Sequence, residues 1–148
     1  MHFNIYLAGE IHTPWRDELK TAATELDLPV SFHSPITDHA SSDDCGVSIL
    51  GSEEKAFWHD QKAAGINSIL TRSLIEKSDI VIVKFGEKYR QWNAAFDAGI
   101  ASALGKQLIV IHPEEFQHAL KKIDAAANAV ASNTDQVLQI LKYITGKA

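Results

Sequence analysis

The chain has 148 residues, of which 45% are hydrophobic and 22% charged, and its formal net charge is −5. This is the composition of an ordinary folded protein, and it excludes disordered, collagen-like and coiled-coil chains. The length predicts a single domain over residues 1–148. The acidic balance disfavours a nucleic acid polymer or an anionic membrane surface as partner and favours small molecules or proteins.

Two observations bear on the cell compartment. Cys45 is the only cysteine, so no internal disulfide can form. No apolar run reaches the roughly 20 residues that span a bilayer, and the N-terminus lacks the basic and apolar regions of a signal peptide. We therefore expect a cytoplasmic protein that does not associate with a membrane.

The predicted elements alternate between short apolar strands and amphipathic helices. In chain order, strands are expected at residues 3–7, 28–33, 79–84, 107–112 and 126–131. Helices are expected at residues 14–26, 67–78, 92–104, 113–122 and 134–144. Thr13 is placed to cap the first helix, Gly105 to end the helix of residues 92–104, and Asn133 or a direct neighbour to cap the last helix.

Residues 34–61 interrupt this alternation, because they are polar, acidic and aperiodic. About 28 residues is long for a plain connection in a compact domain. We therefore predict a functional excursion or lid in this segment, with a short helix around residues 53–61.

The best-defined helix carries an apolar stripe whose members recur three or four positions apart. The stripe consists of Trp92, Ala95, Phe96, Gly99, Ile100, Ala103 and Leu104. Such a stripe predicts the side of a helix that packs on the rest of the protein, so Trp92 is expected in the core.

Apolar strands alternating with helices predict a parallel sheet covered on both faces. Five such units match a three-layer α/β/α, doubly wound fold of the flavodoxin-like or Rossmann-like kind, with strand order 2-1-3-4-5. Ligands of such folds bind beyond the carboxyl ends of the strands. The candidate substrate-binding residues in this region are Gly9, Glu10, His12, Asp38, His39, Arg90, Gln91 and Asn93.

Motifs for common cofactors are absent from the sequence. Neither GxGxxG nor GxxxxGK[ST] follows the first strand, which excludes a dinucleotide fingerprint and a P-loop. The histidines of residues 33–59 lack the spacing of an HExxH metal helix. Cys45 follows two aspartates, which disfavour a nucleophilic thiolate. We expect no cofactor and no metal.

Asp97 is the candidate catalytic residue. It lies one position off the apolar stripe, and Asn93 and Arg90 precede it by four and seven positions, so the three side chains share one side of the helix. A carboxylate beside small alanines, kept ionised by a helix N-terminus, can act as a nucleophile. Spacing alone leaves open the alternative of an exposed aspartate without function.

Several stretches resemble a known family. IYLAG, SDIVIV and FDAGIASALGK, in this order, resemble the nucleoside 2-deoxyribosyltransferase superfamily, and AGEIHTPWRDEL, SPITDH, QWNAAFDAG and IHPEEF resemble its YtoQ branch. The resemblance implies chemistry at the N-glycosidic bond of a nucleoside or nucleotide, with Asp97 in place of the family's glutamate nucleophile. It also implies a homo-oligomer, a dimer or higher, in which residues 113–116 or 132–133 complete a neighbour's pocket.

The chain departs from the family pattern at several positions. Thr71 stands where the family carries an aspartate used as acid or in base recognition. Gln91 and Asn93 stand where the branch that hydrolyses nucleoside monophosphates holds the phosphate with a serine and a glycine. These departures leave the activity and the substrate open.

Glycosyl transfer with retention needs a second, acidic group besides the nucleophile. Glu10, His12, Asp38 and His39 are the candidates, because all can lie at the same edge of the sheet. The sequence leaves three functions open: an enzyme that cleaves or transfers at an N-glycosidic bond, a module that binds a nucleotide-like ligand without turnover, and an interaction scaffold.

Overall fold

Five parallel strands form one sheet in the computed structural model, which describes residues 1–147. The strands are β1 Phe3–Gly9, β2 Val30–His33, β3 Ile80–Lys84, β4 Gln107–Ile111 and β5 Ala129–Ala131. The helices are α1 Trp15–Glu25, α2 His39–Leu50, α3 Ala56–Lys77, α4 Trp92–Ala103, α5 Gln117–Ala126 and α6 Thr134–Ile144, with a 3-10 turn at Glu114–Phe116. The strand order β2-β1-β3-β4-β5 confirms the predicted doubly wound fold.

Each face of the sheet has its own apolar core. Side chains alternate across a strand, so Ile5 and Leu7 of β1 point to one face and Tyr6 and Ala8 to the other. Helices α1 and α6 cover the face of Ile5, and α3, α4 and α5 cover the face of Tyr6. No helix among residues 1–147 is long and apolar enough to cross a membrane.

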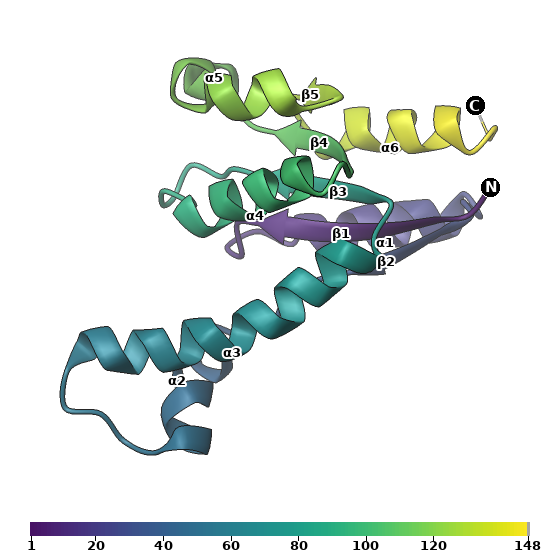
Figure 1. The fold of residues 1–148 in the computed structure, drawn as a ribbon. Helices are drawn as coiled ribbons and strands as arrows, with labels where there is room; N and C mark the ends of the chain where they lie inside the picture. Colours follow the sequence, from purple (N-terminus) through teal and green to yellow (C-terminus); the bar gives the residue numbers. More distant parts are fainter. Residues whose placement is uncertain (148) are drawn as a thin grey trace.

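Residues 34–61, predicted as an aperiodic functional excursion or lid with a short helix around residues 53–61, are mostly helical, because α2 and the start of α3 fill most of this segment. The two helices form a hairpin that projects from the sheet (Figure 1). They meet at Gly46, which is so close to the backbone of Ala63 that a Cβ would not fit. A helix that buries only a narrow strip of small residues shows no apolar periodicity, so its sequence resembles a loop.

The bulky aromatic residues of the α4 stripe face outward, contrary to the prediction, whereas Ala95 and Ile100 of the same stripe pack partly against the core. Trp92 is 73% exposed and Phe96 is 70% exposed. Ala94, Ala98 and Ala101 are buried against the sheet instead. Alanines let the helix axis come close to the strands, and the bulky stripe on the opposite side of the helix is then left in solvent.

Two of the three predicted helix caps are confirmed. Asn133 caps α6 by accepting a hydrogen bond from the backbone of Gln136 at 2.9 Å, and Gly105, with φ of 68°, ends α4 in the left-handed region. Thr13 does not cap α1, because its hydroxyl donates to the carboxylate of Glu10.

Candidate active site

Asp97 lies in the second turn of α4, on the flank between the buried alanines and the exposed stripe. Burial raises the pKa of its carboxyl to about 6. No cation or hydrogen-bond donor among residues 1–147 offsets this burial. The carboxylate is therefore ionised at neutral pH but poorly stabilised, which is a favourable state for attack on an electrophile.

The hydroxyl of Tyr6 lies near Asp97, at the middle of β1. Tyr6 is fully buried, and its Oη has no hydrogen-bond partner within residues 1–147. Burial and then the negative charge of Asp97 raise the pKa of Tyr6, and the positive charge of Arg16 lowers it by less. The neutral hydroxyl is thus a free donor, able to bond to the carboxylate or to a bound ligand.

Sequence reasoning missed Tyr6. The available signal was a phenol within a strand of otherwise aliphatic residues, in the order Ile5, Tyr6, Leu7, Ala8. A buried phenol usually finds a partner for its hydroxyl, so its position in a core strand indicates a polar neighbour across the sheet. The identity of that neighbour depends on which side of α4 packs on β1, and the sequence does not give this.

Glu10 is a second buried carboxylate, only 3% exposed, at the loop after β1. It accepts hydrogen bonds from the backbone N–H of His12 at 2.6 Å and of Thr13 at 3.0 Å, and from the Thr13 hydroxyl. Burial alone would raise the pKa of Glu10, but these bonds and the charge of Lys84, at 3.8 Å, lower it below its usual value. Glu10 is therefore ionised, and its hydrogen bonds stabilise the loop after β1.

The same loop is fixed by close packing of the backbone. Gly9 has a φ of 118°, and a Cβ there would overlap the carbonyl of Lys84. Arg16 donates to the carbonyl oxygens of Leu7, Gly9 and Glu10 at 3.2, 3.1 and 2.6 Å. The residues after β1 are thus held in one conformation against the end of β3.

A cavity of about 400 Å³ opens at the carboxyl edge of the sheet. Its wall includes Glu10, His12, Lys84, Lys88, His112 and Ser132, from the loops after β1, β3, β4 and β5. Two of the predicted binding residues, Glu10 and His12, lie in this wall, whereas Asp97 does not. No group of three or more His, Cys, Asp or Glu side chains in residues 1–147 is arranged to hold a metal ion.

His112 lies in this cavity wall and is 5% exposed. Its Nδ1 lies 2.7 Å from the carbonyl oxygen of Pro113, and its Nε2 lies 2.9 Å from Asp124. Both neighbours are acceptors, so both bonds form only when each ring nitrogen carries a proton. His112 therefore links the loop after β4 to Asp124 of α5.

Three predicted residues come from the start of α4. Gln91 closes the loop before the helix, because its Oε1 accepts from the backbone N–H of Gly86 at 3.0 Å and its amide donates to the carbonyl of Tyr89. Arg90 and Asn93 are exposed. Asn93 precedes Asp97 by one helical turn and is thus placed to contact a ligand that reaches the carboxylate.

The structure places the two remaining predicted residues at the start of α2. Asp38 caps this helix by accepting a hydrogen bond from the backbone of Ser41 at 2.8 Å. The ring of His39 pairs with Asp43 at 2.9 Å, and both side chains are exposed. Neither has a contact with Asp97 among the interactions of residues 1–147.

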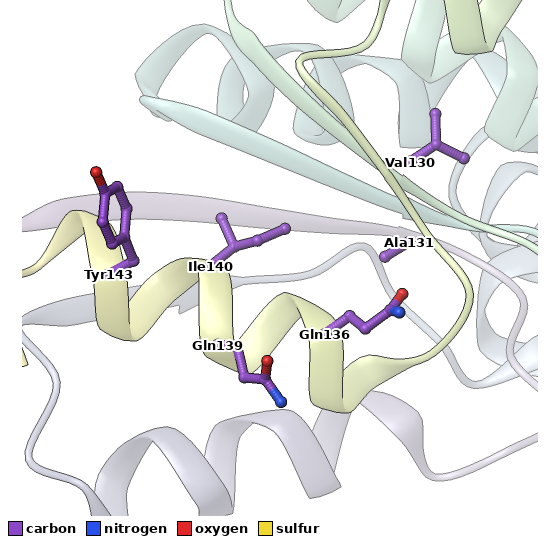
Figure 2. A pocket seen from close by; sticks show the side chains of 6 residues that line it. All are labelled: Val130, Ala131, Gln136, Gln139, Ile140 and Tyr143. Carbon is purple, nitrogen blue, oxygen red and sulfur yellow. The ribbon is translucent and has the colours of Figure 1, made fainter. Parts of the chain in front are cut away.

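A second hollow, of about 440 Å³, lies between β5 and α6. Figure 2 shows its lining side chains, which are Val130, Ala131, Gln136, Gln139, Ile140 and Tyr143. It contains no carboxylate, histidine or lysine, so it offers no group suited to acid–base catalysis at neutral pH. This hollow is therefore not a candidate active site, which leaves the surroundings of Asp97 and Tyr6 and the edge cavity of Glu10 and His12.

Comparisons with known proteins match the part of the chain that holds Tyr6 and Asp97. A family model described as nucleoside 2-deoxyribosyltransferase YtoQ matches residues 6–145, a range that includes both Tyr6 and Asp97. The chain belongs to this YtoQ family. Its predicted membership is thereby confirmed. Within the family, the YtoQ protein of Bacillus subtilis (strain 168) is 44% identical over 144 residues, which cover 97% of each chain.

Solved structures share the fold of this YtoQ family chain. A conserved protein from Enterococcus faecalis V583 has a TM-score of 0.67 at 14% identity and covers 97% of this chain and 99% of its own. The 2-deoxyribosyltransferase of Bacillus psychrosaccharolyticus has a TM-score of 0.55 at 15% identity, covering 91% and 90%. The CMP N-glycosidase BcmB of Clostridium botulinum has a TM-score of 0.55 at 17% identity, covering 95% and 98%. At these identities the likeness concerns the fold.

Proposed function

We propose that the protein cleaves or transfers at the N-glycosidic bond of a nucleoside or nucleotide, with Asp97 as covalent nucleophile. The supporting observation is the half-buried carboxyl of Asp97, with its pKa raised to about 6, near the unpartnered hydroxyl of Tyr6. Family membership and two fold neighbours, a 2-deoxyribosyltransferase and a CMP N-glycosidase, support the same class of reaction.

In the proposed reaction the ionised Asp97 attacks the anomeric carbon of the sugar. The bond from this carbon to the base nitrogen breaks, the base leaves with the electron pair and takes up a proton, and a sugar ester of Asp97 forms. Water or a second base then attacks the same carbon, which releases the carboxylate. The Tyr6 hydroxyl is a donor that can hold the attacking carboxylate in position.

The electrostatics narrow the choice of proton donor for the leaving base. Glu10 has its pKa lowered by hydrogen bonds despite its burial, so it is not a proton donor at neutral pH. Hydrogen bonds from Ser41 likewise lower the pKa of Asp38. Of the four candidates, His12 in the wall of the edge cavity and His39 on α2 remain.

The test is an assay of base release and base exchange with a panel of ribo- and deoxyribonucleosides and their monophosphates. We expect turnover by the wild type and none by Asp97→Asn. The matched control is Asp135→Asn, which changes an exposed aspartate in the first turn of α6 and should keep full activity. Equal turnover by the wild type and Asp97→Asn would refute the nucleophile assignment.

A second candidate function is a module that binds a nucleotide-like ligand without turnover. The observation in its favour is Thr71, whose hydroxyl donates to the carbonyl of Ser68 on α3 at 3.4 Å and replaces the acid of related enzymes. This function predicts that a ligand raises the melting temperature while no product forms. It also predicts that Asp97→Asn retains binding.

A further inference from the structure

The last residue of β2, His33, lies beside Tyr6 in the sheet. β2 is the edge strand next to β1 (Figure 1), and the parallel register pairs His33 with Tyr6 and Phe32 with Ile5. Phe32 packs with Ile5 in the core under α1 and α6. Because side chains alternate along a strand, His33 points to the opposite face, which is the face of Tyr6 and α4. Neighbouring strands are about 4.8 Å apart, so the side chains of His33 and Tyr6 start side by side.

The ring of His33 is half-buried and has no polar partner within residues 1–147. The rings of His39, His59 and His112 lie 2.9, 3.4 and 2.9 Å from a carboxylate oxygen. By contrast, no hydrogen bond or ion pair of these 147 residues involves the His33 ring. Its two ring nitrogens are therefore available to a ligand, as donor or as acceptor.

Two buried polar atoms next to His33 also lack a partner. They are the hydroxyl oxygens of Tyr6 and of Ser34, the residue that follows His33. In residues 1–147 they are the only buried side-chain nitrogen or oxygen atoms without a hydrogen bond. Buried polar groups are nearly always hydrogen-bonded, so a cluster of unsatisfied ones indicates a site where the polar groups of a ligand complete the bonds. Asp97 lies near Tyr6 on the same face, so this cluster adjoins the candidate nucleophile.

The edge cavity that holds His12 extends over the other face of the sheet. Lys84 and Ile111 line this cavity, and Ile111 belongs to the core under α1 and α6. The Lys84 ammonium lies 5.8 Å from the ring centre of Trp15, which is part of the same core. The strands therefore lie between this part of the cavity and the face of Asp97. His12 is thus less well placed than His33 to reach a base whose sugar is bound at Asp97.

We propose that His33 donates the proton to the leaving base, an inference that rests on the proposed function. As Asp97 attacks the anomeric carbon, the electron pair of the breaking bond passes to the base nitrogen, and the imidazolium N–H of His33 protonates the base. The neutral ring then takes a proton back from the water or second base that attacks the sugar ester. Histidine exchanges a proton readily near neutral pH. Glu10 and Asp38 are less suited to this role, because their pKa values are lowered.

Substrates that differ in their need for an acid test this role. An ordinary base leaves poorly without a proton, whereas an N7-methylated purine or a p-nitrophenol leaves without one. We expect His33→Gln to lower kcat/KM at least about 100-fold on the panel of nucleosides and monophosphates. On N7-methylated purine nucleosides and p-nitrophenyl glycosides of the same sugar, it should change kcat/KM little. The matched control, His118→Gln, changes an exposed histidine on α5 and should equal the wild type on both kinds of substrate.

The dependence on the leaving group separates proton donation from a structural role. Equal losses on both kinds of substrate would overturn the proposal, and so would a His33→Gln variant with the kcat/KM of the wild type on the panel. If only His12→Gln or His39→Gln showed the loss that depends on the leaving group, the proposal would also fail. Circular dichroism should report an intact fold for each variant.

Proton NMR of the His33 ring gives a readout that does not need turnover. In Asp97→Asn, titration with the nucleosides and monophosphates of the panel should shift the C2 proton resonance of His33 and leave that of His118 in place. An unmoved His33 resonance would overturn the proposal even for an active wild type. A shifted resonance together with a wild type inactive on every substrate would refute the proposed function and the proton transfer, leaving His33 as a ligand contact alone.

Discussion

Two carboxylates of this chain, the buried Glu10 and the half-buried Asp97, have opposite environments. Glu10 receives two backbone N–H groups, the Thr13 hydroxyl and the charge of Lys84, which lower its pKa against the effect of burial. Asp97 receives none of these among residues 1–147, and burial raises its pKa to about 6. The difference indicates that Glu10 serves the structure of the loop, and that Asp97 remains free for chemistry.

The largest expected effect is on activity at Asp97. Asp97→Asn should lower kcat/KM by at least about 10³-fold, because the amide cannot form the sugar ester. Asp97→Glu keeps a carboxylate, one methylene longer, at this position and should keep measurable turnover. Steady-state kinetics on the best substrate of the panel checks both. If Glu10→Gln lowered kcat/KM as much as Asp97→Asn, the contrast between the two carboxylates would be lost.

The second effect is on stability and has a defined dependence on pH. The pKa of Asp97 is raised from 3.8 to about 6 in the folded protein, so its protonated form is the favourable one. Its contribution to stability is full below pH 3.8 and is lost as the pH rises through 6. Asp97→Asn should therefore raise the free energy of unfolding at pH 7 by about 3 kcal/mol. Urea unfolding at pH 4 and pH 7 measures this, and equal gains at both pH values would contradict it.

The third effect is a loss of stability at Glu10, opposite in sign to the gain expected for Asp97→Asn. Glu10→Gln should lower the free energy of unfolding at pH 7 by about 2 kcal/mol, because it replaces charge-assisted hydrogen bonds. The pKa of Glu10 is lowered in the folded protein, so its contribution is present above the unfolded value of 4.5 and is lost as the pH falls through the folded value. The same urea series checks this, with Glu18→Gln in the exposed first turn of α1 as the matched control. If Glu10→Gln lost no more free energy of unfolding than Glu18→Gln, the structural role of Glu10 in the loop after β1 would be contradicted.

The smallest effect concerns Tyr6. Tyr6→Phe removes a buried hydroxyl without a partner and should leave the free energy of unfolding unchanged or raise it by about 1 kcal/mol. It should nevertheless lower kcat if the Tyr6 hydroxyl positions the attacking carboxylate of Asp97, as proposed above. Unfolding and kinetics on the same sample test the pair of effects. A destabilised variant with normal kcat would assign Tyr6 to the structure alone.

Much of the fold follows from local sequence patterns. The continuous apolar runs of β1, β3 and β4 predict buried parallel strands, and Asn133 and Gly105 mark helix ends by their own chemistry. Helix α2 and its packing on α3 escape prediction because the two helices meet through Gly46, against Lys62 and Ala63, and so narrow a contact leaves no periodic signal. The stripe of α4 is visible in the sequence, but the sequence cannot say that alanines rather than Phe96 face the sheet.

The candidate site is also predictable only in part, because the sequence does not show which side chains the tertiary fold brings together. The position of Asp97 follows from its helix and from the family resemblance. The roles of Glu10 and Tyr6 depend on which groups the tertiary fold brings to each polar atom. A carboxylate in a loop and one in a helix look alike in the sequence until their hydrogen-bond donors are known.

The covalent role of Asp97 is tested most directly by trapping its sugar ester. Intact mass spectrometry after incubation with 2-deoxy-2-fluororibosyl nucleosides and nucleotides should show one added sugar per chain, and peptide mapping should place it on Asp97. The Asp97→Asn variant should gain no mass under the same conditions. A wild type that turns over substrate without forming an adduct, or that carries the sugar on another residue, would contradict the account.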